Sequence, residues 1–181
     1  MGLEATVEAQ ESFPTTQPAF RLTSHFKDKH PCGDVYTGST LIGVPLLAGG
    51  TVKSVGDFQP RCNFTIASST DYFTVDADKT HGRIDAQAIL VDEEGRAVRL
   101  RIDGVVALNE HTLPLIQNEP NAANSPFGYG VEFLKFETGH EMYKPLESMR
   151  FAGSQRFVYL DGVRTGVEVR ISRVVSGTGE A

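Results

Sequence analysis

Apolar and polar side chains alternate along most of the chain with a period of two residues. The clearest case is AVRLRID at 97–103, where Val98, Leu100 and Ile102 alternate with polar or charged neighbours. Alternation of this kind places successive side chains on opposite faces of a β-strand. Residues 84–91 have a similar pattern, and the turn DEEG joins the two runs, so we expect a β-hairpin there.

Further short runs of β-forming residues are separated by turns that contain glycine, proline or asparagine. They occupy residues 19–26, 34–38, 40–54, 61–69, 72–77, 129–139, 149–162 and 165–175. No long amphipathic helix is predicted. Residues 140–149 allow one or two helical turns, because Pro145 limits their length. Residues 110–128 have a mixed composition that predicts a long loop.

About eight to ten short strands, with turn signals every 8–12 residues, are typical of a barrel or a sandwich. We favour a single antiparallel β-barrel of about eight strands, because closing the sheet removes its exposed edges. A barrel of this size encloses packed side chains or one small ligand. The expected domain covers residues 18–175, with flexible tails at 1–17 and 176–181.

Composition narrows the function. The chain has 181 residues, of which 40% are hydrophobic, and a net charge of −6. Its basic residues are scattered, so a nucleic-acid partner is not expected. No apolar run has the ~20 residues of a membrane helix, so we expect no membrane insertion. Residues 1–20 lack a secretory signal pattern, so we expect a cytoplasmic protein in which Cys32 and Cys62 are free thiols.

Four ordered segments resemble one family. They are AGGTV, STDYFTVDADKTHGRIDAQAILVDEEGRAVRLRIDG, YGVEFLKFETGHEMYKPLESMRFAG and VEVRISRVV, between about Phe20 and Val175. Together they resemble the domain of unknown function 3237 family, which comprises small β-barrel proteins of bacteria and fungi. The resemblance implies a barrel with a lumen, but it does not supply a reaction.

The chain departs from the family pattern at three positions. Gln87 and Val131 stand where relatives usually carry arginine, and Pro145 stands where they carry tryptophan. If those arginines hold an anionic ligand in relatives, the resemblance implies a less charged ligand for this protein.

Three side chains are candidates for catalysis. Asp71, which matches a family anchor, is either a carboxylate tuned by burial at the barrel mouth or a strand-end residue that holds a turn. Gln87 faces either the lumen or water, depending on which face of its strand is buried. Tyr129 either offers its phenol to a substrate oxygen or packs in the core.

The wider set comprises candidate ligand-binding residues of the same strands. These are His25, Tyr72, Ile89, Val131 and Phe133. Arg99 and Arg101 alternate against the apolar stripe, so we expect them outside the barrel. The five histidines form no metal-binding motif, and no nucleotide-binding glycine motif is present, so we expect neither a metal nor a cofactor.

Two classes of function fit these observations. The first is a cofactor-free enzyme of natural-product metabolism that binds a small hydrophobic metabolite and promotes a cyclisation, isomerisation or pericyclic step by positioning and hydrogen bonding. The second is a non-catalytic barrel that binds a ligand or is purely structural. A lumen of roughly 300–1,000 Å³ with converging polar groups would favour the enzyme. Apolar positions on both faces of residues 84–91 also predict a homodimer.

Overall fold

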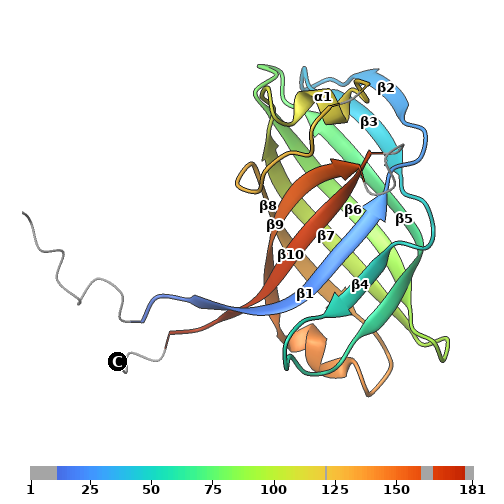
Figure 1. The fold of residues 1–181 in the computed structure, drawn as a ribbon, viewed down its shortest axis with the longest axis vertical. Helices are drawn as coiled ribbons and strands as arrows, with labels where there is room; N and C mark the ends of the chain where they lie inside the picture. Colours follow the sequence, from blue (N-terminus) through green and yellow to red (C-terminus); the bar gives the residue numbers. More distant parts are fainter. Residues whose placement is uncertain (1–11, 121, 160–164, 178–181) are drawn as a thin grey trace, which may run out of the picture.

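The computed structural model describes residues 12–120, 122–159 and 165–177, and consists almost entirely of antiparallel β-strands (Figure 1). The strands are β1 (Thr15–His25), β2 (His30–Asp34), β3 (Thr40–Pro45), β4 (Thr51–Ser54), β5 (Asn63–Val75), β6 (His81–Val91), β7 (Ala97–Ala107), β8 (Gly130–Glu137), β9 (Arg150–Tyr159) and β10 (Thr165–Val175). Two single-turn helices accompany them, α1 (Leu113–Ile116) and the 3₁₀-helix η2 (Lys144–Ser148).

The sheet closes on itself. Its strand order is β2-β3-β5-β4-β1-β10-β9-β8-β7-β6, and β5 also pairs with β6, which makes a ring of eight strands from β5 through β4, β1 and β10 back to β6. The predicted barrel is therefore confirmed over the sandwich. β4 pairs with the first part of β5 and β3 with its last part, so the two short strands share one side of β5.

The predicted hairpin is β6–β7. Its register is continuous from the pair His81–Ala107 to the pair Val91–Ala97. The turn between them is held by the Asp92 carboxylate, whose Oδ1 accepts from the amides of Glu94 at 3.0 Å and Arg96 at 2.9 Å. Gly95 adopts a φ of +81°, a conformation that glycine reaches at little cost.

Ordered structure begins earlier than the sequence indicates. Residues 15–17 were expected in a tail, but they pair with residues 173–175 at the end of β10. This two-stranded extension projects beyond the barrel, and its residues at 15–18 are exposed (Figure 1). Backbone pairing rather than apolar burial holds it, which explains why the hydrophobic pattern did not predict it. The rest of both expected tails, residues 1–11 and 178–181, lies outside the described residues.

The two helices lie at opposite ends of the barrel (Figure 1). The helical turn expected within 140–149 is η2. The segment at 110–128 was expected to be only a loop, but it contains α1, and Leu115 of that helix is fully buried. Thr165 Oγ1 donates to the Leu115 carbonyl at 3.1 Å, which ties the helix to β10.

Aromatic rings fill the half of the barrel nearer η2. Phe20 lies 4.8 Å from Phe58, 5.4 Å from Phe136 and 5.5 Å from Phe151, measured between ring centroids. Phe136 and Phe151 meet edge to face at 5.2 Å. This end of the lumen is thus a packed core, and any cavity must lie toward α1.

Removing one ring of this cluster should cost much of the stability of the domain. We expect Phe136→Ala to lower the free energy of unfolding by about 3–5 kcal/mol, because a fully buried phenyl leaves a cavity that its neighbours cannot refill. Urea unfolding followed by circular dichroism measures the change. Tyr36→Ala, at a fully exposed ring, is the control and should change the value by less than about 0.5 kcal/mol. Equal effects would contradict the packed-core assignment.

Candidate functional site

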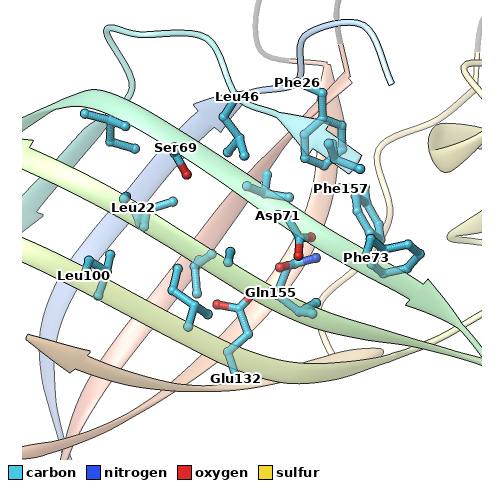
Figure 2. Close-up of a pocket in the computed structure, with 18 of the residues that line it drawn as sticks. Leu22, Phe26, Leu46, Ser69, Asp71, Phe73, Leu100, Glu132, Gln155 and Phe157 are labelled. Atoms are coloured by element: carbon cyan, nitrogen blue, oxygen red, sulfur yellow. The ribbon is translucent and has the colours of Figure 1, made fainter. Parts of the chain in front are cut away.

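The half of the lumen nearer α1 holds a cavity of about 70 Å³ (Figure 2). Its walls come from β1, β3 and β5 to β10, and most of the lining is apolar. The polar lining residues are Lys29, Ser69, Asp71, Glu132 and Gln155. The volume is below the roughly 300–1,000 Å³ of typical ligand pockets, but it suffices for a few waters or a small organic group.

Small residues keep this half of the barrel open. Among the inward residues of β6, Ala86 and Ala88 line the cavity, whereas the half of the lumen nearer η2 is packed with phenylalanines. Alanine fills little of a barrel lumen, so these two positions contribute to the open space. Larger side chains, Phe26, Phe73 and Phe157 among them, form other parts of the cavity wall. The structure therefore places the alanines of β6 inside and the alternate residues, Asp85 and Gln87 among them, outside.

A bulge in β5 brings Asp71 into the lumen. Phe64 and Ile66 face inward before it, and the pairing with β6 shifts register between Ile66 and Ser68. The extra residue reverses the alternation, so Ser69 and Asp71 then line the cavity. Without the bulge, Asp71 would lie on the outer face.

Glu132 enters from β8, and its carboxyl is almost completely enclosed. Its residue exposure is 2%, and Oε2 has no hydrogen-bond partner among the described residues. Its two cross-strand neighbours are Gly104 of β7 and Gly153 of β9. A Cβ at Gly104 would lie 3.0 Å from Glu132 Cγ, and one at Gly153 would lie 3.5 Å from Glu132 Oε2. Gly104 therefore leaves room for the Glu132 side chain, whereas the distance at Gly153 is that of an ordinary contact.

Asp71 is held by one backbone hydrogen bond. The amide of Asp85 on β6 donates to Asp71 Oδ1 at 3.0 Å. Figure 2 shows the ends of Asp71, Glu132 and Gln155 pointing toward one another across the cavity. The three residues come from β5, β8 and β9, so only closure of the barrel brings them together.

Burial changes the acidity of both carboxyls. Removal from water raises the pKa of Glu132 to about 8, and the nearby Asp71 carboxylate raises it further. Burial raises the pKa of Asp71 to about 6, although the hydrogen bond from the Asp85 amide acts in the opposite direction. Near neutral pH, Glu132 is therefore protonated and Asp71 is ionised. One member can donate a proton while the other accepts one.

The mouth of the cavity lies beneath α1. Lys29 Nζ donates to the carbonyl of Ile116, and both residues line the cavity. Burial lowers the pKa of Lys29. Among the described lining residues Lys29 is the one basic group, and its hydrogen bond joins the β1–β2 loop to α1 over the opening.

Of the three candidate catalytic residues, Asp71 lines the cavity and the other two do not. Gln87 lies on the outer face of β6 and accepts a hydrogen bond from Arg99 at 2.7 Å. Of the two alternatives for Gln87, the outer face is the one observed, because the small alanines take the inward positions, so Gln87 does not line the cavity as a candidate catalytic residue. Tyr129 lies at the start of β8, half-buried and stacked on His111 with 5.2 Å between ring centroids.

The candidate ligand-binding residues also lie outside the cavity. Val131 and Phe133 point outward, because Glu132, Leu134 and Phe136 take the inward phase of β8. Ile89 points outward, because Ala88 and Leu90 take the inward phase of β6. Tyr72, Ile89, Val131 and Phe133 are 53%, 40%, 50% and 58% exposed. His25 is half-buried on β1 and does not line the cavity. The expectation that these five residues line the lumen is therefore wrong.

Sequence reasoning missed Glu132 and Gln155. A signal for Glu132 was present, because it shares the period-two phase of Leu134 and Phe136, where a charged residue is unexpected. The prediction that Tyr129, Val131 and Phe133 face the lumen placed Glu132 on the outer face, so it was not considered as a site residue. Gln155 gave a weaker signal. It shares the inward phase of Phe151 and Phe157 on β9, but an uncharged glutamine is less unexpected there than a carboxyl.

Other catalytic chemistry finds little support in the described residues. Cys62 is buried, and burial raises the pKa of its thiol to about 12, so it is not a nucleophile. Within residues 12–120, 122–159 and 165–177, no cluster of three or more His, Cys, Asp or Glu has metal-binding geometry. Neither helix in that part of the chain has the length and apolar composition of a membrane span.

The buried carboxyls should make stability depend on pH. Between pH 4.5 and about 8, folded Glu132 keeps a proton that the unfolded chain releases. The free energy of unfolding should therefore fall as pH rises through this window, by a few kcal/mol. Asp71 adds a smaller fall in the same direction below about pH 6.

Glu132→Gln should flatten this fall and raise stability above neutral pH, because the amide has no charge to bury. Urea unfolding at a series of pH values measures the slope. Glu141→Gln, at an exposed carboxyl, is the control and should keep the slope of the original protein. The same slope in Glu132→Gln would contradict the burial argument.

Known proteins share this architecture. The chain has a TM-score of 0.67 and 19% identity to a conserved protein of unknown function from Rhodopseudomonas palustris, covering 90% of this chain and 99% of that one. It has a TM-score of 0.68 and 17% identity to a β-barrel-like protein from Acinetobacter baumannii, covering 92% and 99%. An enzyme from Penicillium herquei gives a TM-score of 0.56 and 15% identity, covering 97% and 100%.

At these identities the likeness shows the fold alone. No curated protein has a significant sequence match to the chain. A family profile described as "protein of unknown function (DUF3237)" matches residues 14–174, which include all ten strands apart from the last residue of β10. The chain therefore belongs to the DUF3237 family.

Proposed function

We propose that this protein is a cofactor-free enzyme in which Glu132 and Asp71 act as general acid and general base on a small substrate in the lumen. The reaction class is an isomerisation or cyclisation. One observation carries the proposal: a buried carboxyl, whose Oε2 has no hydrogen-bond partner among the described residues, faces a second, partly buried carboxyl in an apolar cavity. A purely structural core rarely retains such a group, because its burial is costly.

The chemistry is balanced without another reactant. Glu132 donates its proton to a basic atom of the substrate, and Asp71 removes a proton from a different atom. The substrate leaves with its original composition and a rearranged set of bonds. The proton then passes from Asp71 to Glu132, whose side chains face each other (Figure 2), and the enzyme is reset. Gln155 orients the substrate by hydrogen bonding. In a pericyclic step, Glu132 and Gln155 would donate hydrogen bonds to the substrate, and the ionised Asp71 would only accept one.

The lining favours a neutral and mostly apolar substrate. An ionised Asp71 in an apolar cavity repels anions, and the one basic lining group, Lys29, is already bonded to the Ile116 carbonyl. The volume of about 70 Å³ limits the part of the substrate that is enclosed. A larger metabolite requires movement of the side chains and of α1 at the mouth, or insertion of one reactive end only.

The described Penicillium herquei enzyme supports the proposal by showing that a similar barrel is found in an enzyme. The apolar lumen also suits the alternative, a barrel that binds a small ligand without catalysis. Chemistry at the carboxyl pair distinguishes the two. A binding protein would tolerate loss of the Glu132 proton donor, whereas the proposed enzyme would not.

Substitution of the acid should abolish turnover while the fold persists. We expect Glu132→Gln to lower the rate at least about 100-fold and Asp71→Asn at least about tenfold, since each removes one proton-transfer group. The metabolite profile of a gene-deleted host, complemented with each variant, measures activity. The compound that accumulates then serves as substrate for the purified protein. Full activity of both variants would overturn the proposal, and Glu141→Gln serves as the active control.

The rate of the purified enzyme should have a bell-shaped dependence on pH. Activity rises as Asp71 ionises near pH 6 and falls as Glu132 loses its proton near pH 8. Steady-state rates across this range, on the substrate identified above, provide the measurement. A rate that stays constant from pH 5 to pH 9 would be inconsistent with acid–base catalysis by this pair.

A further inference from the structure

The outer face of β6, β7 and β8, together with Tyr72 of β5, carries exposed hydrophobic side chains. Tyr72, Ile89, Val131 and Phe133 are 53%, 40%, 50% and 58% exposed. They are four of the eight large exposed hydrophobic residues in the described part of the chain. The pairing of β5 to β8 places them on one outer face of the barrel, here named the outer patch, with Asp85 and Asp103 between Tyr72 and Phe133. A gathering of this kind marks an interaction surface.

Within the outer patch, acidic side chains lie opposite acidic ones and basic side chains lie opposite basic ones on neighbouring strands. Asp85 lies directly opposite Asp103 in the β6–β7 pairing, and Arg101 lies directly opposite Lys135 in the β7–β8 pairing. Like charges at directly opposite positions destabilise a sheet. Asp85, Asp103 and Arg101 form no ion pair with any other described residue, whereas Lys135 bonds to Glu137 at 2.9 Å. An acidic row and a basic row therefore lie side by side, two residues apart along β7.

We propose that a second copy of this chain docks on the outer patch about a two-fold axis that crosses β7 between Arg101 and Asp103. With the axis in the plane of the interface and perpendicular to β7, the strand direction is reversed between the copies. Asp103 of one copy then meets Arg101 of the other, and the symmetric contact forms at the same time. Phe133 and Val131 flank this centre and are covered by the partner.

Self-complementarity is the reason to choose a second copy as the occupant. A two-fold interface uses the same surface on both subunits, so an acidic row beside a basic row matches itself after rotation. Across the axis, Asp103 of each copy meets Arg101 of the other, so the dimer supplies an opposite charge to one member of each like-charge pair. The Phe133 ring, next to Asp103 in the β7–β8 pairing, supplies apolar area beside the charged centre of the contact. This proposal concerns the outside of the barrel and is independent of the proposed function.

Charge reversal provides a sharp test. Asp103→Lys and Arg101→Glu should each increase the dimer dissociation constant at least about tenfold, because each creates two repulsive contacts across the axis. Sedimentation equilibrium of the full chain over a hundredfold dilution measures this. Within one chain both substitutions remove a like-charge pair, so the thermal stability of the monomer should stay the same or rise. If Asp103 and Arg101 only supported the fold, substitutions that weaken the dimer would also lower the thermal stability of the monomer.

An equimolar mixture of the two variants restores complementarity, because every charge at the axis then meets its opposite. We expect a heterodimer with an affinity near that of the original homodimer, detected by native mass spectrometry. Asp57→Lys, an exposed reversal outside the outer patch, should leave the dissociation constant unchanged. The proposal is overturned if the original protein is monomeric throughout, if its dimer resists both reversals, or if the mixture forms no heterodimer.

Discussion

Pairing of β5 with β6 is the interaction on which the rest of the structure depends. It joins β6, at one end of the ten-stranded order, to β5, and so closes eight of the strands into a ring. β5 therefore pairs with β3, β4 and β6. The bulge between Ile66 and Ser68 accommodates the change of partner along β5. Because the bulge also reverses which side chains face inward, the device that helps close the barrel places Asp71 in the lumen.

The lumen is divided by side-chain size. Phenylalanines at one end form a dry core that supports the barrel. Alanines and glycines at the other end leave a cavity into which Glu132 projects. A carboxyl enclosed there destabilises the fold when it ionises, and the same enclosure keeps it protonated near neutral pH. Burial of the Glu132 carboxyl therefore both lowers the stability of the fold at high pH and raises the pKa of the carboxyl. Such conflicts between stability and local chemistry are common at functional sites.

The strands β6, β7 and β8 serve two surfaces at once. Their inward residues build the cavity, and their outward residues carry the exposed rings and the separated charges. Asp85 links the two surfaces, because its backbone amide bonds to Asp71 while its side chain lies outside, opposite Asp103. Gln87, Ile89, Val131 and Phe133 were predicted to face the lumen but lie on the outer surface, although other residues of the same strands line the cavity.

Alternation in the sequence was sufficient to predict most of the strands, the β6–β7 hairpin and a closed barrel, because period-two burial is a local property of each strand. It did not predict β2, and most of the run expected at 34–38 is a turn. The runs expected at 61–69 and 72–77 form one strand, β5. The family resemblance, rather than the alternation, pointed to Asp71. The parity of β5 after its bulge, the choice between the two faces of β6 and β8, and the meeting of Asp71 with Glu132 and Gln155 were decided by tertiary structure alone. Each depends on which strands become neighbours, and strands far apart in sequence carry no local record of that pairing.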